Sequence, residues 1–315
     1  MSIRRTIFDS YNEWELFSSI ESQWSERGFV LYPSLPFWNI FDITKLDVTP
    51  EERSFLFKTS VDYTLCTKEG RPLVSIEFDG ISHGFSRRGE YVAVRDAPSN
   101  DPRRHWKLDL KVRLATDAGY PLLVVSYHEK NAISKDTHLT IVDGAIGQVL
   151  AARHFRERLN EHVAEAEAQL AEMNSARAHE YMQDAVLSLE VEADLEWNPL
   201  ARAAAKSDYE LFEAGIAPGW SVSYLDPPGV PEAVSLDLLS LQDVAKFEAR
   251  VEALNRATWV GCRITYNTPR GPASADAWVR NIEHAGVHPL GLAEDIAKLL
   301  AAHRAKDVFG GKATA

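Results

Sequence analysis

Residues 70–83 read GRPLVSIEFDGISH, and they follow the shorter run VDYTL at residues 61–65. Both runs alternate residue types along the chain, and a turn that carries Gly70 separates them. Alternation with a period of two on either side of such a turn is typical of a β-hairpin. We therefore expect two antiparallel strands here, with the other elements arranged around them.

Acidic side chains are expected to gather on one face of this hairpin. Side chains alternate faces along a strand, so Glu77 and Asp79 share a face of the second run, while Asp62 and Thr64 share a face of the first. If the two faces coincide, three carboxylates converge, and a cation or protons must offset their repulsion. Hard divalent cations such as Mg²⁺ or Mn²⁺ prefer oxygen ligands of this kind. The alternative is a solvated sheet face with Asp62 at a strand end.

The segments that flank the hairpin alternate between helical and strand patterns. Their order along the chain is helix, strand, strand, strand, helix, strand, which indicates an α/β fold. A polar, basic loop is expected between the hairpin and the second main helix. Around the hairpin we expect a helix at residues 12–27, a strand at 29–32 that ends at Pro33, a short helix capped by Thr49, a helix at 105–118 and a strand at 121–127.

The second half of the chain has a different character. An Ala/Glu/Arg-rich stretch beyond Asp143 predicts one or two long, exposed helices, and a mixture of helical and strand-like segments follows. Among the latter are helices at 241–256 and 290–305 and strands at 220–225 and 259–266. We therefore expect three parts, namely a first domain at 1–143, a helical connector at 144–192 and an α+β domain at 193–315.

Composition limits the class of protein. The 315 residues carry a formal net charge of −12, which on average repels polyanions, but Lys and Arg outnumber Asp and Glu by eight to four between residues 84 and 113. Two cysteines argue against a disulfide scaffold and favour the cytoplasm. The N-terminus lacks a signal-peptide pattern, and no apolar run suits a membrane span, so a membrane partner is not expected.

The hairpin runs, together with LDLKVRLATDAGYPLLVVS at residues 108–126, resemble the core of the PD-(D/E)XK nuclease superfamily. The resemblance is to the branch with E-x-D-G-x-x-H, which includes bacterial nuclease-like domains and, more distantly, very short patch repair endonucleases. It covers residues 12–129. It implies a restriction-endonuclease-like αβββαβ core and metal-dependent hydrolysis of phosphodiester bonds in nucleic acid, which we expect to be DNA. Roles in defence and in repair are both compatible with the resemblance, and the residues do not choose between them.

The resemblance also assigns roles to individual residues. Asp62 and Glu77 match the metal-binding acids of the second and third core strands, and Glu13 resembles an acid on the first helix. These three would hold Mg²⁺ or Mn²⁺. Among them, Asp62 and Glu77 also count as catalytic residues.

Further catalytic roles fall on three other positions. His83 matches the histidine that follows the glycine, a candidate for proton transfer or transition-state stabilisation. Lys111 could substitute for the lysine that normally lies two residues after the acid. In this sequence Asp79 occupies that position, and this departure puts water activation in question.

Basic residues near the hairpin would contact the phosphates of the substrate. For each of them singly, a solvated loop position is the simpler interpretation. Two other functions stay open: a catalytically silent module that binds nucleic acid, and an interaction protein that recruits a partner through the helical segment 144–192. The expected phosphate contacts are Arg87, Arg88, Arg103, Arg104 and Lys107.

Overall fold

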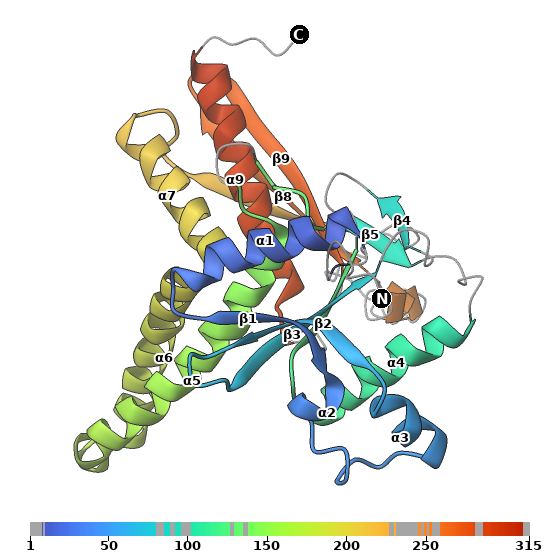
Figure 1. Ribbon diagram of the computed structural model, residues 1–315. Helices are drawn as coiled ribbons and strands as arrows, with labels where there is room; N and C mark the ends of the chain where they lie inside the picture. Colours follow the sequence, from blue (N-terminus) through green and yellow to red (C-terminus); the bar gives the residue numbers. More distant parts are fainter. Residues whose placement is uncertain are drawn as a thin grey trace.

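The protein is described by a computed structural model, in which helices pack around a central and a peripheral sheet (Figure 1). This mixed arrangement confirms the α/β class. Within the described residues, no helix combines the length and apolar character that crossing a bilayer requires. The structure describes residues 8, 10–79, 85–88, 92–95, 102–126, 129–134, 138–226, 230, 245–246, 249–250, 252–253, 259–280 and 286–310.

The central sheet has the strand order β1-β2-β3-β6. It consists of β1 (Val30–Pro36), β2 (Ser60–Cys66), β3 (Pro72–Asp79) and β6 (Leu122–Ser126). Neighbours among the first three strands pair antiparallel, whereas β3 and β6 run parallel. The predicted hairpin at residues 61–79 is therefore confirmed.

Strand β1 is longer than the sequence suggested. The expectation that it ends at Pro33 is wrong, because pairing with β2 continues to Pro36. Proline lacks an N–H group and is tolerated in a sheet on an edge strand, which is where β1 lies. The proline therefore marks the edge of the sheet and not the end of the strand.

Helices cover both faces of this sheet. Helix α1 (Tyr11–Ser25) begins with a capping box between Ser10 and Glu13 and buries Leu16, Ile20 and Trp24 against one face. Helix α4 (Pro102–Asp117) packs Leu110 and Leu114 against the other face.

Strand β6 contacts both layers, since Leu122 faces α4 while Leu123 and Val125 face α1. Its continuous apolar run is explained by burial on both sides.

Two short helices and a small hairpin are inserted between the main elements. Helices α2 (Phe37–Ile40) and α3 (Pro50–Leu56) follow β1, and the predicted Thr49 cap of α3 is present. The segment expected to be a basic loop contains strands β4 (Phe85–Arg88) and β5 (Val92–Arg95), which pair antiparallel. Valine at two positions of β5 favours a strand over a loop.

Two long helices occupy the middle of the chain. They are α5 (Ile141–Glu172) and α6 (Ser175–Trp197), so the expected boundaries at residues 143 and 192 lie inside helices. The prediction that these helices are exposed throughout is wrong for the first turns of α5, which are buried because they pack against α7 (Pro199–Glu213) and α9 (Pro289–Gly310). A protein partner for the segment 144–192 stays a prediction.

Glycine at two positions allows the buried end of α5 to approach its neighbours closely. A Cβ atom on Gly144 would lie 2.5 Å from the Leu292 side chain of α9, and one on Gly147 would lie 2.6 Å from the Asn198 backbone. One connected cluster of buried side chains then extends from α1 through α5 to α9. The first and last parts of the chain therefore share a hydrophobic core.

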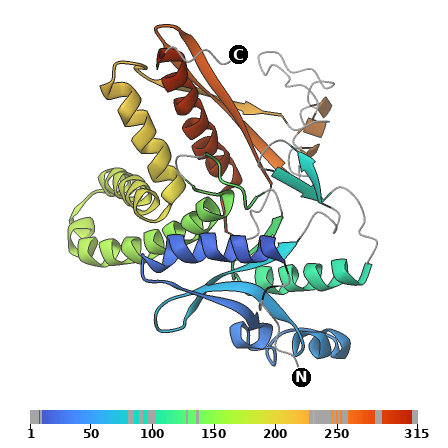
Figure 2. The ribbon, with the colours of Figure 1, turned by 45° about the horizontal axis from the view of Figure 1, so that its top comes forward.

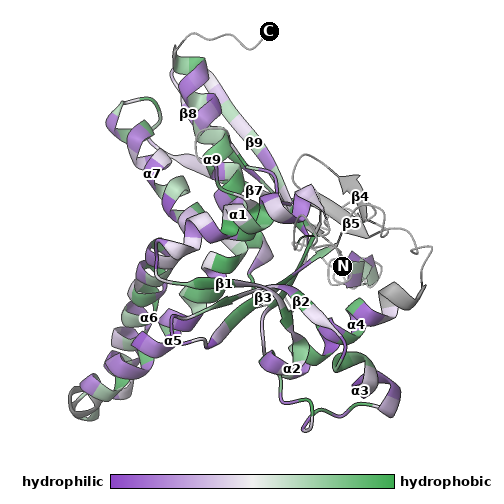
Figure 3. Cartoon of the chain, in the orientation of Figure 1, coloured by the Kyte–Doolittle hydropathy of each residue, from purple (hydrophilic) through white to green (hydrophobic). Residues whose placement is uncertain are grey.

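The peripheral sheet has the order β7-β8-β9 and is antiparallel throughout. It contains β7 (Trp220–Leu225) and β8 (Trp259–Thr268), where the strand patterns predicted them, and β9 (Gly271–Arg280). Helix α9 covers one face of this sheet (Figure 2). Hydrophobic residues concentrate on the central strands and on α9, while the distant ends of α5 and α6 are more hydrophilic (Figure 3). Most of the expected helix at residues 241–256 lies outside the described residues.

Candidate active site on the central sheet

The side chains of Thr64 and Ser75 face each other across β2 and β3, so the register brings together the two faces that the sequence left open. The two residues are register partners, and their hydroxyl oxygens are 2.9 Å apart. The Tyr120 hydroxyl lies 3.0 Å from the Ser75 oxygen and extends this buried chain of hydrogen bonds. Burial raises the pKa of Tyr120, so the hydroxyl stays protonated and can donate. The chain of hydroxyl groups fixes the register of the strands beside the acidic residues.

Glu77 and Lys111 form a buried ion pair. The Lys111 Nζ atom is 2.7 Å from Glu77 Oε1, and the two residues are 7% and 9% exposed. Lys111 reaches the sheet from α4, and its ammonium group also donates to the backbone oxygen of Ser60 at 2.7 Å. A short, charge-assisted hydrogen bond of this kind is strong and orients both partners. The lysine therefore joins the first residue of β2 to the acidic residue near the end of β3.

Asp62 is held at the same corner of the sheet. Its Oδ2 atom accepts a hydrogen bond of 2.8 Å from the backbone N–H of Phe78, the residue that follows Glu77. The backbone pairing of β2 with β3 ends at Tyr63 and Ile76. Beyond that point, the hydrogen bond from Phe78 to the Asp62 carboxylate still joins the two strands. Asp62, Glu77 and Lys111 are thus brought together by two strands and one helix.

Glu13 lies on the opposite layer. The Tyr63 hydroxyl donates to the Glu13 backbone oxygen at 3.0 Å, and the Glu13 carboxylate accepts from the Ser10 backbone in the capping box of α1. Burial raises the pKa of Tyr63, and the negative charges of Asp62 and Glu13 act in the same direction. The Glu13 carboxylate therefore has a structural role at the start of its helix.

The other predicted site residues are placed only in part. His83 lies outside the described residues. The backbone of Asp79 ends β3. Lys107 is exposed one turn before Lys111 on α4, and its Nζ atom lies 5.7 Å from the centre of the Phe55 ring. The backbones of Arg87 and Arg88 belong to β4, and those of Arg103 and Arg104 belong to the first turn of α4.

The oxygen ligands offered to a divalent cation are few. Asp62 and Glu77 supply carboxylate oxygens, which are the donor type that Mg²⁺ and Mn²⁺ prefer. In the part of the chain that the structure describes, no three Asp, Glu, His or Cys side chains are grouped closely enough to hold a metal ion. The carboxylate oxygens of Asp62 and Glu77 fit Mg²⁺ or Mn²⁺. Within the described residues of this site, these two side chains are the protein ligands on offer.

One contact near the site was not predicted from the sequence. Arg280, at the end of β9, forms a double hydrogen bond of 3.0 Å with the buried Glu129 carboxylate and also donates to the backbone oxygen of Val124. Val124 is the register partner of Glu77 in the parallel β3–β6 pair. The peripheral sheet is therefore attached to the strand beside Glu77. Arg280 and Glu129 are 151 positions apart in the sequence, so no local pattern could predict this pair.

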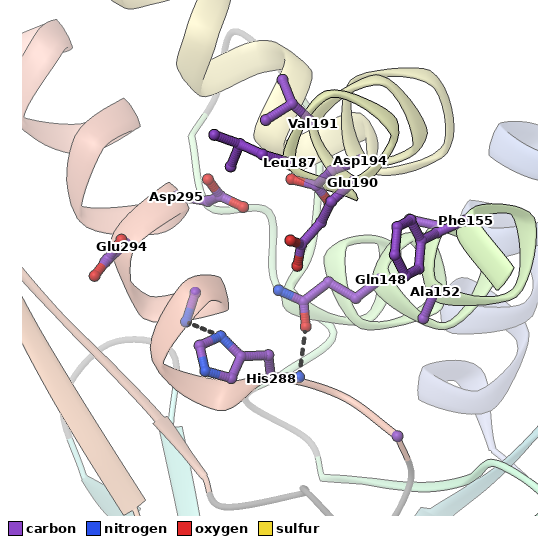
Figure 4. Close-up of a pocket in the computed structure, with 13 residues that line it drawn as sticks. Gln148, Ala152, Phe155, Leu187, Glu190, Val191, Asp194, His288, Glu294 and Asp295 are labelled. Carbon is purple, nitrogen blue, oxygen red and sulfur yellow. Dashed lines mark hydrogen bonds between the residues drawn. The ribbon is translucent and has the colours of Figure 1, made fainter. Parts of the chain in front are cut away.

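A separate acidic hollow of about 480 Å³ lies between α5, α6 and α9 (Figure 4). Asn198 donates to both Asp194 and Asp295, at 3.0 and 3.4 Å. Burial and the nearby Asp194 charge raise the pKa of Asp295 to about 8, and burial also raises that of Asp194. Its acids are partly buried or exposed, and they come from helices and not from paired strands, so this hollow is distinct from the first site.

Comparisons with protein-family models, with curated proteins and with solved structures find no match to this chain.

Proposed function

We propose that this protein is a metal-dependent nuclease that hydrolyses phosphodiester bonds of DNA at the Asp62–Glu77–Lys111 site. The observation that carries the proposal is the 2.7 Å contact between Lys111 and Glu77. The PD-(D/E)XK pattern requires a lysine beside the acid of the third core strand, and the sequence has Asp79 at the usual lysine position. A lysine from α4 that reaches the same acid supplies the required charge from another element.

The arrangement of the surrounding elements also supports the proposal. The sheet order β1-β2-β3-β6, with an antiparallel start and a parallel last strand, follows the αβββαβ order of a restriction-endonuclease-like core. Helices α1 and α4 lie on opposite faces of that sheet. The two acids are on the second and third strands, which are the positions that the resemblance assigns to them.

Asp62 and Glu77 are the residues that would hold Mg²⁺ or Mn²⁺. When bound, such a cation supplies Lewis-acid polarisation of the phosphate and lowers the pKa of a coordinated water molecule. The hydrogen bond from Phe78 orients the Asp62 carboxylate at this corner of the sheet. The protein contributes the fixed orientation of both carboxylates.

Lys111 would stabilise charge or orient the attacking water. An ammonium group has three N–H donors, and among the described residues Glu77 and Ser60 receive two of them. The third donor can bind a phosphate oxygen or a water molecule. Because burial makes a positive charge more effective than it would be in water, this contact stabilises negative charge that develops on the phosphate.

Substrate binding would use the basic residues next to the site. Lys107 is exposed one helical turn from Lys111, and Arg103 and Arg104 precede it on the same helix. Contacts with phosphates are independent of base sequence. They weaken at higher salt, because the release of condensed counterions on binding then gains less free energy. Lys107 would thus add an exposed positive charge one helical turn from the buried lysine.

The test is cleavage of plasmid and single-stranded DNA with Mg²⁺ or Mn²⁺. We expect Glu77→Gln and Lys111→Met each to lower the rate at least about a hundredfold, as the loss of one stabilising group does in other enzymes. The control is Glu157→Gln, which removes a similar carboxylate from an exposed ion pair on α5. Salt-sensitive DNA binding without turnover in either metal would overturn the nuclease proposal and favour a catalytically silent binding module. Equal cleavage by all variants would remove this site from the mechanism.

A further inference from the structure

A second hollow, of about 440 Å³, lies between α1, α7 and α9, and we propose that it binds the phosphate groups of a nucleotide. We call it the basic hollow. Its volume falls within the range of small-molecule sites. Its polar lining includes Gln23, Arg202, Lys206, Ser207, His303 and Lys306.

The basic side chains come from two facing helices. Arg202 and Lys206 are one turn apart on α7, and His303 and Lys306 are one turn apart on α9, so each pair presents its side chains on one side of its helix. Glu210 is the one acidic residue among the lining residues. Four basic residues therefore line one hollow in a chain whose formal net charge is −12, and Arg202 and Lys206 are exposed at its rim.

Glu210 neutralises only part of this charge. Its carboxylate accepts from Lys306 at 2.6 Å and lies 3.9 Å from Lys206. The hydrogen bond and charge of Lys306 lower the pKa of Glu210, so the carboxylate is ionised and fixes the position of the lysine. Two unit positive charges remain in excess, apart from His303. This excess offsets much of the negative charge of a diphosphate, whose terminal phosphate alone carries about −1.5 to −2 at pH 7.

The Arg202 guanidinium is the group best placed to recognise the ligand. Among the residues that the structure describes, no acidic side chain pairs with it, and it carries five N–H donors in a planar arrangement that suits phosphate oxygens. Arg202 is the fourth residue of α7, near the helix end where the backbone dipole favours negative charge. The helix dipole therefore does not favour an arginine at this position, whereas it would stabilise an anion bound there.

The remaining walls suit the rest of a nucleotide. Leu139, Pro199 and Ala203 contribute apolar surface, and the Ser207 side chain adds a hydroxyl at a residue that is 7% exposed. A concave site with apolar walls fits a discrete ligand that has a sugar and a base. A nucleic-acid duplex would instead require an extended basic surface.

The basic hollow is independent of the proposed nuclease site. Gln23 belongs to α1, which packs on the Tyr63 face of the central sheet, whereas Lys111 approaches from the opposite face. Helix α1 and helix α4, which carries Lys111, lie on different sides of the central sheet in Figures 1 and 2. A ligand in the hollow therefore contacts neither Asp62 nor Glu77.

The experiment is calorimetric titration of the full chain with ADP and with inorganic pyrophosphate, at about 50 and about 200 mM salt. We expect saturable binding that weakens at higher salt. The double variant Arg202→Gln/Lys206→Gln should bind at least about tenfold more weakly, because two phosphate contacts are lost. Circular dichroism of each variant shows whether the fold is retained.

Two controls locate the ligand. The variant Lys45→Gln/Arg158→Gln removes the same charge from exposed positions outside the hollow and should bind like the native chain. Glu77→Gln should also bind like the native chain, even if the protein proves to have no nuclease activity. Absence of saturable binding, unchanged affinity in the Arg202/Lys206 variant, or lost affinity in Glu77→Gln would each overturn the proposal. Binding of a single-stranded oligonucleotide but not of ADP would also overturn it and indicate a contact for the nucleic-acid backbone.

Discussion

Replacing Lys111 with methionine should destabilise the protein, because the variant leaves the Glu77 carboxylate buried without its cation. The side chains of the pair are 8% and 11% exposed and lie 2.7 Å apart. At an effective dielectric constant of about 20, the attraction at that distance is about 6 kcal/mol. Removing one partner of a buried pair typically costs about 3–5 kcal/mol, since the remaining charge keeps its desolvation penalty.

Replacing both partners should restore stability. In Lys111→Met/Glu77→Leu no charge is left buried, and a hydrophobic pair of similar volume is commonly neutral or stabilising. The Ser60 carbonyl loses its donor in both variants, so the comparison between them cancels that loss. We therefore expect the double variant to unfold at a higher urea concentration than Lys111→Met.

Urea unfolding followed by tryptophan fluorescence and by circular dichroism measures both free energies. The control is Arg113→Met, two residues further along α4, which breaks the 2.8 Å pair with Glu52. The Arg113 side chain is 46% exposed, so this variant should lose less than about 1 kcal/mol. A loss below about 1 kcal/mol in Lys111→Met, or a double variant as unstable as the single one, would refute the assignment of a desolvated pair.

Two further predictions concern other parts of the fold. Burial raises the pKa of Asp143 from 3.8 to about 6, so the native state favours the protonated acid, and the free energy of unfolding should fall by about 3 kcal/mol as pH rises through that interval. Urea unfolding at a pH below 3.8 and at a pH above 6 measures this loss, and Asp143→Asn should not show it. If the free energy of unfolding of Asp143→Asn depended on pH as that of the native chain does, the reasoning would be wrong. In Gly261→Ala the new Cβ atom would lie 2.1 Å from the Trp278 ring, so we expect a loss of about 1–3 kcal/mol, measured by thermal unfolding. Gly219→Ala, which has open space around the new atom, is the matched control and should unfold like the native chain.

Local sequence patterns predicted most of the individual elements. The Thr49 cap, the alternation in residues 61–79 and the apolar run of β6 each depend on residues close together in the chain, and each is present in the structure. Patterns that depend on distant partners were less informative. Pro33 suggested the end of a strand because the sequence does not show which strand lies at the edge of the sheet.

The candidate site shows the same division. The sequence by itself determined that Asp62 and Glu77 lie on neighbouring strands, because alternation and the turn predict the hairpin. Whether the faces of the two strands coincide was decided by the register, which pairs Thr64 with Ser75. It offered Lys111 as a substitute lysine only through a resemblance.

The tertiary structure decided that the Lys111 ammonium reaches Glu77, that Arg280 contacts the strand beside Glu77, and that α7 and α9 together enclose the basic hollow. These contacts join residues that are from 34 to 156 positions apart in the sequence. Such contacts depend on how helices and sheets pack, which local periodicity does not encode.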